Sequence, residues 1–400
     1  MYACTCLGFV KRKTPYLSLM TLPVYLDCNA TTPMEEDVWK IVRYFFEVEY
    51  GNDGSRTHEF GTRAKQAVQR AREQVSLTLS CQRDEIIFTS GATESNNLAL
   101  LGLAQAATRS GRMHIVSTAI EHKAVLEPLE HLGTRGFEIT LIPPCSTGRV
   151  NAQAIREAMR PDTFAVSVMH ANNETGIVQP LDEICEVLRD HSAYLHVDAA
   201  QTFGKLIEPL QNARIDLISL SGHKIYGPKG IGALATRRRG YEKVPLSPLI
   251  FGGGQERNLR PGTLPVPLVV GLGVASEIAL KSHKKRTSDC IKFGNRLEQA
   301  LLPLGARRHG SKEYCLPHVI NLSFPGIDSE ALIVALKSLV AISNGSACTS
   351  ASYKPSHVLE AMGLAPDDIS GAIRLSWCHM TPDVDWSQVI TRIHQLLPDN

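Results

Sequence analysis

The first 240 residues of the chain alternate short apolar runs with longer amphipathic segments. Seven of these runs have the length and the β-prone composition of buried strands, and helix-like segments separate most of them. Strands that are buried on both faces are continuous apolar runs, and helical crossovers join parallel strands. The pattern therefore predicts an α/β fold with a mainly parallel, seven-stranded sheet. The predicted strands are residues 86–90, 114–118, 138–142, 164–169, 194–198, 215–220 and 231–236.

Helical periodicity precedes the sheet, and the pattern changes again after it. Before the first strand, apolar residues recur at the spacing of one helix face. These residues are Ala64, Ala67, Val68, Ala71, Val75 and Leu79. A chain of 400 residues exceeds the size at which single cores usually stop growing, so we expect a second lobe beyond residue 240. Its predicted elements are a helix over 267–303, strands over 319–323 and 372–376, a helix over 329–338, and a closing helix that Thr381 and Pro382 begin.

Composition and charge describe an ordinary globular protein. Hydrophobic residues make up 43% of the chain and charged residues 20%, as in typical globular domains. The formal net charge of +2 is too close to zero to favour nucleic acid or an anionic membrane as the main partner. No apolar run approaches the ~20 residues that a transmembrane helix needs. We therefore expect neither direct nucleic-acid binding nor a membrane partner.

Ten cysteines are scattered along the chain, without a C-x-x-C pair or a Cys/His cluster at zinc spacing. This scatter favours a reducing, cytoplasmic compartment over a disulfide scaffold and predicts no metal site. The first 19 residues contain no acidic residue, and their apolar part precedes a basic run, the reverse of a signal peptide. We interpret residues 1–19 as a disordered or misassigned extension, with an organelle-targeting peptide as the alternative.

Polar side chains follow one predicted strand after another. Ligands of parallel sheets bind beyond the carboxyl ends of the strands. Alone, each side chain has a structural explanation, such as a helix cap for an aspartate or a core position for a histidine. Together they favour a binding site, and the small residues from 90 to 97 suit a phosphate at a helix N-terminus. The polar residues at the strand ends are Thr93, His122, Asn173, Asp198, Gln201, His223 and Lys224.

Lys224 stands in the segment Ser221–Gly230, between two predicted buried strands. Burying a strongly hydrated ammonium group costs free energy unless its pKa falls or it reacts. A desolvated lysine is nucleophilic and suits a Schiff base with an aldehyde cofactor. A solvated surface loop is the alternative, and the row of polar strand ends disfavours it.

These motifs resemble those of the class I cysteine desulfurases, the NifS/IscS type of pyridoxal-phosphate enzyme, from Tyr25 to about residue 380. The resemblance implies a fold-type I, aminotransferase class V-like homodimer. It implies a large cofactor domain over 33–282 and a small α+β domain built from 20–32 and 283–400. The matching segments are Asp27–Pro33, Thr89–Asn97, Glu121–His122, Asn172–Gly176, Asp198–Gln201, Ser221–Gly230, Arg260–Pro265, Gly345–Ser352 and Ile373–Ser376.

The resemblance also implies how pyridoxal 5'-phosphate is held. Lys224 would bind it covalently and later move the substrate α-proton, and Asp198 would pair with the pyridine nitrogen. Gln201 would bond the ring hydroxyl, with Asn173 close to it, and His122 would lie on the ring face. The phosphate would be bound by Ala92, Thr93, Ser221 and His223, with Thr263 reaching across from the other subunit.

For the substrate, L-cysteine, the resemblance implies a carboxylate site and a nucleophile. Arg374 offers a bidentate fork for the carboxylate, with Asn29 and Asn173 beside it. Cys348 would attack the substrate sulfur, keep it as a persulfide and release alanine. The small residues around Cys348 suit a mobile loop better than a core, whereas the other nine cysteines fit structural positions.

Two segments depart from the family pattern. Trp377–Met380 reads Trp-Cys-His-Met where Leu-Gly-Arg-Phe is usual, and the loop 51–58 also differs. The variant resembles the branch that serves DNA phosphorothioation, with iron–sulfur cluster assembly and tRNA thiolation as other destinations for the sulfur. Sulfur-acceptor proteins would be the partners. Alternatives are a selenocysteine lyase or an aminotransferase on the same fold, and a non-catalytic sulfur-relay scaffold.

Overall fold

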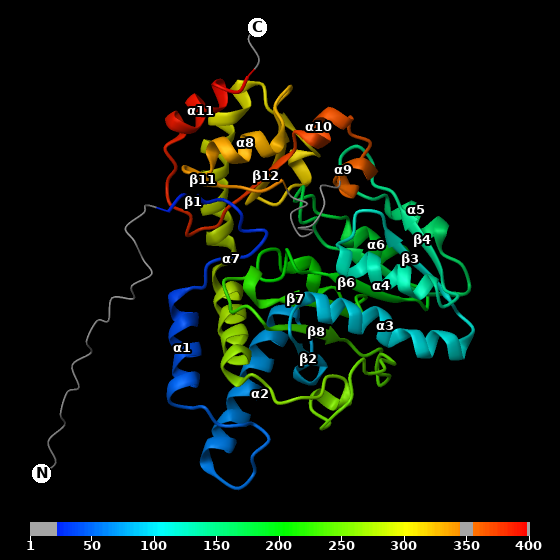
Figure 1. The fold of residues 1–400 in the computed structure, drawn as a ribbon. Coiled ribbons are helices and arrows are strands. Elements are labelled where there is room, and N and C mark those ends of the chain that lie inside the picture. The colour runs from blue at the N-terminus through cyan, green and yellow to red at the C-terminus, as the bar shows by residue number, and fades with distance from the viewer. Residues whose placement is uncertain (1–21, 345–354, 398–400) are drawn as a thin grey trace, which may run out of the picture.

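The structure is a computed structural model that describes residues 22–344 and 355–397 (Figure 1). The predicted extension 1–19 and the predicted nucleophile Cys348 lie outside the described residues. Within them, a large seven-stranded sheet forms the centre, and a group of smaller elements lies at one end of it (Figure 1).

The central sheet has the strand order β2-β8-β7-β6-β5-β3-β4. All neighbours are parallel except β8, which runs antiparallel to both β2 and β7. The predicted α/β fold with a mainly parallel sheet is therefore confirmed, with strand bounds within two residues of the prediction. The strands are β2 Ile86–Thr89, β3 His114–Thr118, β4 Glu138–Ile142, β5 Thr163–Met169, β6 Tyr194–Asp198, β7 Leu217–Ser221 and β8 Gly232–Thr236.

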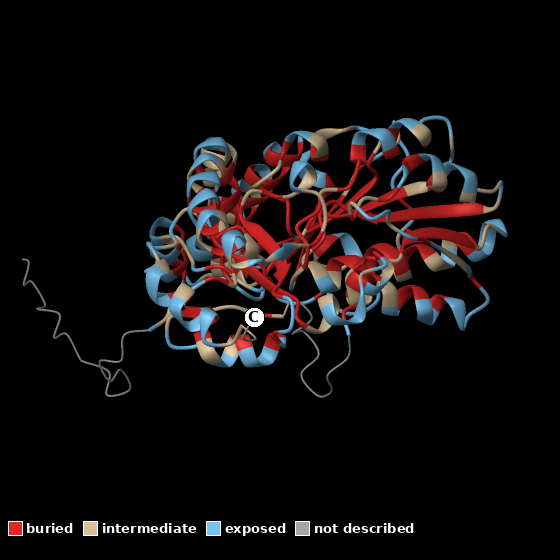
Figure 2. Cartoon of the chain, turned by 90° about the horizontal axis from the view of Figure 1, so that it is seen from above, coloured by how far each residue is buried: buried red, intermediate tan, exposed pale blue. Residues whose placement is uncertain are grey.

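Helices cover both faces of this sheet. On one face α3 (Ala92–Ser110) and α4 (Lys123–Gly133) share an apolar core with the sheet. The other face packs against the remaining helices, and Figure 2 shows the sheet as the most continuously buried part of the molecule. Neighbouring residues of a strand point to opposite faces, so Ile87 belongs to the first core while Ile86 and Phe88 belong to the second. The helices of the second face are α1 Glu36–Glu47, α2 Glu59–Leu79, α5 Ala152–Ala158, α6 Leu181–Val187 and α7 Val266–Leu301.

Helix α2 carries the apolar stripe that the sequence predicts. Five of the six stripe residues are buried, and Ala67 is half-buried. The helix begins after His58, whose side chain accepts a hydrogen bond from the N–H of Gly61. It ends at Ser80 in the left-handed conformation. The local sequence therefore sets both ends of the helix that supports β2.

Helix α7 joins the central part of the molecule to the smaller group of elements. By length and composition alone it could cross a membrane, but half of its apolar window is buried. It packs against α1 and α2, as a core helix does. Its first half contributes Val269 and Leu272 to the core under the sheet, and its second half contributes Phe293 and Leu297 to another core.

That other core is built from both ends of the described chain. Leu26, next to β1, packs with residues beyond 289, and β1 pairs with β11 in parallel. The domain boundaries at 32/33 and 282/283 stay a prediction. Helices α9 and α10, although they come late in the chain, pack against the core under the central sheet and not against this other core. The elements of this region are β1 Val24–Tyr25, β9 Arg307–Arg308, β10 Val319–Ser323, α8 Ser329–Leu336, β11 Val340–Ala341, α9 His357–Ala361, α10 Pro366–Ser370, β12 Ile373–Ser376 and α11 Trp386–His394.

The start of the closing helix differs from the prediction. Helix α11 begins at Trp386, and Asp385 caps it by accepting from the N–H of Ser387. Thr381 accepts a hydrogen bond from the N–H of Cys378 instead. A Thr-Pro pair often marks the start of a helix. Here the threonine hydroxyl is used in a hydrogen bond within a local turn, so it does not cap the helix.

Candidate active site

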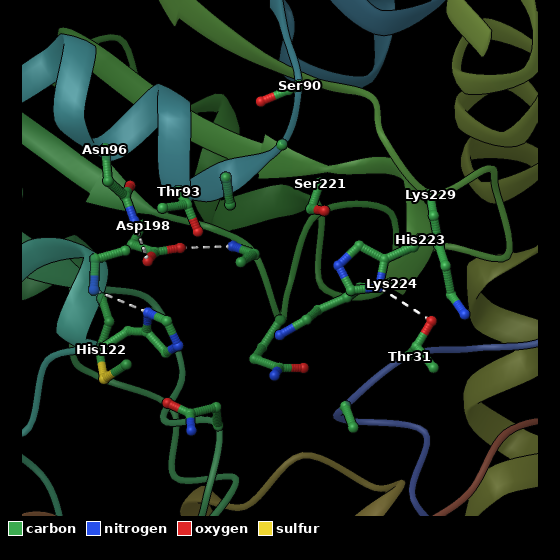
Figure 3. A pocket seen from close by; sticks show the side chains of 18 of the residues that line it. Thr31, Ser90, Thr93, Asn96, His122, Asp198, Ser221, His223, Lys224 and Lys229 are labelled. Carbon is green, nitrogen blue, oxygen red and sulfur yellow. Dashed lines mark hydrogen bonds between the residues drawn. The ribbon is translucent and has the colours of Figure 1, made fainter. Parts of the chain in front are cut away.

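A cavity of about 550 Å³ lies at the carboxyl edge of the parallel strands (Figure 3). It collects side chains from the ends of β2, β3, β5, β6 and β7. Figure 3 shows Asp198 and His122 on one side of it and His223 and Lys229 on the other. Nine sequence-predicted residues line it, namely Ala92, Thr93, His122, Asn173, Asp198, Gln201, Ser221, His223 and Lys224.

Asp198 is buried and its carboxylate is held by two hydrogen bonds. Oδ2 accepts from the side-chain amide of Asn96 at 2.7 Å, and Oδ1 accepts from the N–H of Ala200 at 2.9 Å. Asn96 also lines the cavity and was not predicted. Its position three residues after Thr93, on the same face of α3, was the available signal. The pair presents a fixed, buried carboxylate to the cavity.

His122 caps α4 and lines the cavity with its ring. Its Nδ1 accepts from the N–H of Ala124 at 3.1 Å, so the neutral ring carries its proton on Nε2. Burial lowers the pKa of His122 below its ordinary value. The charge of Asp198 opposes this shift, and that of Lys224 adds to it. A neutral imidazole beside the cavity can accept or donate a proton.

The first turn of α3 forms the base of the cavity at Gly91, Ala92 and Thr93. The free N–H groups at the start of a long helix suit a phosphate. On β8, Gly232 allows this turn to lie close, because a Cβ there would stand 2.6 Å from Gly91 Cα. The packing of β8 thus keeps the N-terminus of α3 at the cavity.

On the opposite side, Ser221 ends β7 and His223 lies in the short turn that follows it. His223 Nδ1 lies 3.1 Å from Thr31 Oγ1. Burial, together with the charges of Lys224 and Lys229, lowers the pKa of His223 to about 4. The imidazole is therefore neutral at pH 7. Lys224 itself is half-buried and lines the cavity, so the alternative of a fully solvated lysine is wrong.

A hydrogen-bond network joins Gln201, Asn29 and Asn173. The side-chain amide of Gln201 donates to the backbone carbonyl oxygen of Asn29 at 3.0 Å. The side-chain amide of Asn29 donates in turn to the backbone carbonyl oxygen of Asn173 at 3.1 Å. Gln201 Oε1 and Asn29 Oδ1 are buried without a hydrogen-bond partner. Buried polar groups normally have partners. These two acceptors fit a bound group that carries donors, such as the ring hydroxyl of pyridoxal phosphate.

Arg374, on β12, lies behind this network and is not among the residues that line the cavity. Its Nη1 donates to the Asn173 carbonyl at 2.9 Å, and its Nη2 pairs with Asp27 Oδ1 at 2.6 Å. Each terminal nitrogen thus already bonds one acceptor of the protein. Asp27, which also accepts from Ser343 at 3.1 Å, was not predicted as its partner.

Thr263 lies apart from the cavity and is exposed. Two ion pairs hold the loop before it. Buried Arg72 donates to both carboxylate oxygens of Glu256, at 2.9 and 2.6 Å, and Arg260 donates to Glu94 at 2.9 Å. The second pair ties the loop to the first turn of α3.

Two buried carboxyl groups next to the cavity were also not predicted. Glu121 accepts from the Thr118 hydroxyl at 2.6 Å, and burial raises its pKa to about 8. Glu174 accepts from the hydroxyl of Ser356, just before α9. His357 Nε2 lies 3.0 Å from the Glu121 carbonyl oxygen. Helix α9 is thus bonded to the two turns that carry His122 and Asn173.

The residues of the cavity fit pyridoxal phosphate. A lysine, a buried carboxylate, a helix N-terminus and an unpartnered buried amide oxygen surround one space of suitable size. The sequence alone grouped most of these residues. The sequence predicts no metal site. Within the described residues, no group of three or more histidine, cysteine, aspartate or glutamate side chains could hold a metal ion.

Comparison with known proteins identifies the family. The aminotransferase class-V family model matches residues 24–387. The cysteine desulfurase IscS of Rickettsia massiliae (strain Mtu5) is 42% identical over 383 residues, covering 95% of this chain and 92% of that protein. DndA from Streptomyces lividans is 50% identical in its crystal structure, with a TM-score of 0.78, covering 87% of this chain and 98% of that one. A structure of SspA in complex with cysteine is 38% identical, also with a TM-score of 0.78, covering 88% and 98%. The chain belongs to the aminotransferase class-V family and, within it, to the pyridoxal-phosphate-dependent cysteine desulfurases.

Proposed function

We propose that the protein converts L-cysteine to L-alanine and keeps the sulfur as a persulfide on Cys348. In this reaction the substrate C–S bond breaks and a new S–S bond forms on the enzyme. The substrate carbon that loses the sulfur takes up a proton. One observation carries the proposal: Lys224, Asp198 and His122 surround one cavity in a chain of this family. When bound, pyridoxal phosphate supplies an electron sink for the carbanion that forms at the substrate α-carbon.

Three residues handle the cofactor ring and the protons. Lys224 holds the cofactor covalently and moves the substrate α-proton. Asp198, oriented by Asn96, keeps the pyridine nitrogen protonated. His122, neutral because burial lowers its pKa, exchanges a proton near the ring face through Nε2.

The rest of the cavity binds and orients. Gln201 accepts a hydrogen bond from the ring hydroxyl through its unpartnered Oε1, and Asn173 lies beside it. Ala92, Thr93, Ser221 and His223 bind the phosphate at the N-terminus of α3.

The substrate carboxylate binds to Arg374 and Asn29. Each terminal nitrogen of Arg374 has a second N–H, so the guanidinium can bind the carboxylate while it keeps its bonds to Asp27 and Asn173. The resemblance of the segment Gly345–Ser352 supports Cys348 as nucleophile.

The protein acts as a homodimer, in which Thr263 binds the cofactor phosphate of the partner subunit. The exposed position of Thr263 supports this role. Large apolar side chains are exposed in two regions, with Trp39, Phe46 and Tyr50 around α1 and Phe251 before the Thr263 loop. Exposed apolar patches of this kind mark interaction sites. Sedimentation that gives a monomer at micromolar concentration would contradict the dimer.

The sulfur acceptor is a partner protein in the cytoplasm. All seven cysteines within the described residues are unpaired, in keeping with a reducing compartment. Identity to DndA exceeds that to the IscS relative, which favours DNA phosphorothioation over iron–sulfur cluster assembly and tRNA thiolation. Capture of the partner that takes up labelled persulfide sulfur identifies the pathway.

Alanine release measured together with mass spectrometry of the sulfur adduct tests the proposed activity. A desulfurase releases one alanine for each sulfur that it takes from cysteine. An aminotransferase would instead need a keto acid, and a selenocysteine lyase would act on selenocysteine but not on cysteine. A sulfur-relay scaffold would stay colourless with added pyridoxal phosphate and release no alanine.

A further inference from the structure

Two cysteines from opposite ends of the chain meet in one buried cluster. Cys28 is 1% exposed and Cys378 is 3% exposed, and they pack together with Tyr226. The backbone brings them together, because Asp27 bridges to Ser376 in parallel and the N–H of Cys28 donates to the Ser376 carbonyl at 3.0 Å. Cys378 lies in the segment that departs from the family pattern, so the resemblance assigns no role to this pair.

The turn after Cys378 surrounds its sulfur with hydrogen-bond donors. The Thr381 hydroxyl donates to Sγ at 3.7 Å while it accepts from the N–H of Cys378 at 2.9 Å. The N–H of Met380 and the thiol of Cys28 also stabilise the charged form of this sulfur. The Cys28 bond is the largest cause that lowers the pKa of Cys378 to about 6, although burial opposes the shift. Of the two thiols, Cys378 is therefore the one whose charged form the surroundings favour.

A cation and a cavity lie next to this cluster. Lys205 interacts electrostatically with both thiols, and its Nζ lies 3.2 Å from Nε2 of buried His318. Burial lowers the pKa of Lys205, and its protonated form would favour a thiolate in this cluster. Lys205, His318 and Tyr226 line a cavity of about 170 Å³, and Tyr226 also contacts the thiol pair. Cys28 and Cys378 do not line the cavity themselves, so a molecule as small as hydrogen peroxide held there lies one side chain, Tyr226, away from the thiol pair.

We propose that Cys28 and Cys378 are a redox modification site, in which hydrogen peroxide converts the thiol pair into a reversible disulfide. The Cys378 thiolate attacks one peroxide oxygen, the O–O bond breaks, and the leaving hydroxide takes up a proton to form water. The Cys28 thiol then attacks the resulting sulfenic acid, so that an S–S bond forms and a second water leaves. The two thiols lose two electrons in total, and the peroxide gains them.

The disulfide changes the substrate site. Asn29 follows Cys28 directly, and its N–H donates to Ser376 Oγ at 2.9 Å, two residues before Cys378. An S–S bond of about 2.05 Å draws the two segments closer than contacting thiols lie. Losing a hydrogen bond to a charged group costs about tenfold or more in affinity, so displacement of Asn29 makes the oxidised enzyme bind cysteine poorly. This consequence rests on the proposed roles of Asn29 and Arg374, whereas the disulfide itself does not.

The modification is tested on holoenzyme that carries Cys348→Ser, so that the proposed nucleophile cannot be oxidised. After peroxide treatment, free thiols are alkylated and the protein is digested without reductant. The expected product is a Cys28–Cys378 linked peptide that disappears with dithiothreitol. Adding Cys28→Ser, which keeps a hydroxyl donor beside Cys378, should leave Cys378 as a sulfenic acid that dimedone traps, and adding Cys378→Ala should abolish the link. The proposal is overturned if both thiols stay reduced or if Cys28 or Cys378 links to Cys290 instead.

The effect on substrate is measured in the same protein as the visible spectral change on adding cysteine. Peroxide should raise the apparent Kd for cysteine at least about tenfold, dithiothreitol should reverse this, and Cys28→Ala should prevent it. An unchanged Kd in protein with the mapped disulfide overturns the effect on the substrate site. Failure of the reduced protein to respond to cysteine at all would contradict the proposed function, and the peptide map would still decide the modification.

Discussion

The side-chain amide of Asn96 donates a 2.7 Å hydrogen bond to Asp198 Oδ2 at the edge of the central sheet. Asn96 lies on the first turns of α3, which also presents the proposed phosphate site, and Asp198 ends β6. One helix therefore positions the two ends of the proposed cofactor site. The aspartate is oriented by a neutral partner and keeps its charge available for the cofactor ring.

We predict that Asn96→Ala weakens cofactor binding and lowers turnover by about tenfold, since Asp198 loses its orienting hydrogen bond. Asp198→Ala should abolish nearly all turnover, because the ring nitrogen loses its proton. Titration of the apoprotein with pyridoxal phosphate and the rate of alanine release measure both effects. Asn97→Ala is the matched control, because Asn97 bonds only the Thr93 carbonyl within its own helix. Equal turnover in wild type and Asp198→Ala would remove Asp198 from the site.

Lys224→Ala should abolish desulfuration, because in the proposed mechanism Lys224 both binds the cofactor covalently and moves the α-proton. Some cofactor should remain bound through the phosphate site at α3. Borohydride treatment followed by peptide mapping should fix the cofactor to Lys224 in the wild type and to no lysine in the variant. Lys229→Ala, which removes the other lysine of the cavity, serves as the comparison. Alanine release at the wild-type rate from Lys224→Ala would contradict the assignment.

Much of the site could be predicted because strand ends are visible in sequence. A short apolar run marks a buried strand, and the polar residue that follows it lies at the edge where ligands bind. His122, Asp198 and Lys224 were found in this way. Periodicity reports burial but not strand direction, so the antiparallel orientation of β8 was not predicted.

Contacts between distant segments could not be predicted by the same reasoning. The sequence indicates that Arg374 is a strong anion binder, but it does not reveal that Asp27 already occupies part of its guanidinium. Glu121 and Glu174 lie within motifs of the family, but their burial depends on contacts with Thr118, Met169 and Ser356. These features depend on tertiary packing, which a local pattern does not encode.

Glu121 should make the stability of the protein depend on pH. Burial raises its pKa to about 8, whereas an unfolded glutamate titrates near ~4.3. Between these values the folded state keeps a proton that the unfolded state has lost. The free energy of unfolding therefore falls as pH rises through this window, by up to ~1.4 kcal/mol per pH unit.

Glu121→Gln removes this titration and keeps an oxygen that accepts from Thr118 and from the N–H of Met169. We predict that the variant gains stability relative to wild type between about pH 5 and about pH 8. Urea unfolding across that range measures the difference. Glu130→Gln, at an exposed position on α4, should follow the wild type. A Glu121→Gln curve parallel to the wild-type curve would show that Glu121 is ionised in the folded state.

Cys348→Ser should separate cofactor chemistry from sulfur transfer. The hydroxyl is close in size to the thiol, so folding and the colour of the bound cofactor should survive. Serine is a far weaker nucleophile than cysteine at neutral pH. Cysteine should therefore still change the visible spectrum, but no persulfide should form and almost no alanine should be released.

Cys28→Ser and Cys378→Ser, kept under reducing conditions, are the matched controls and should retain most activity. They test whether a thiol near the substrate segment can replace Cys348 as the acceptor. Alanine release and mass spectrometry of the sulfur adduct give the answer together. Normal turnover by Cys348→Ser, or extra sulfur on the Cys28 peptide of the wild type, would assign the nucleophile to another cysteine.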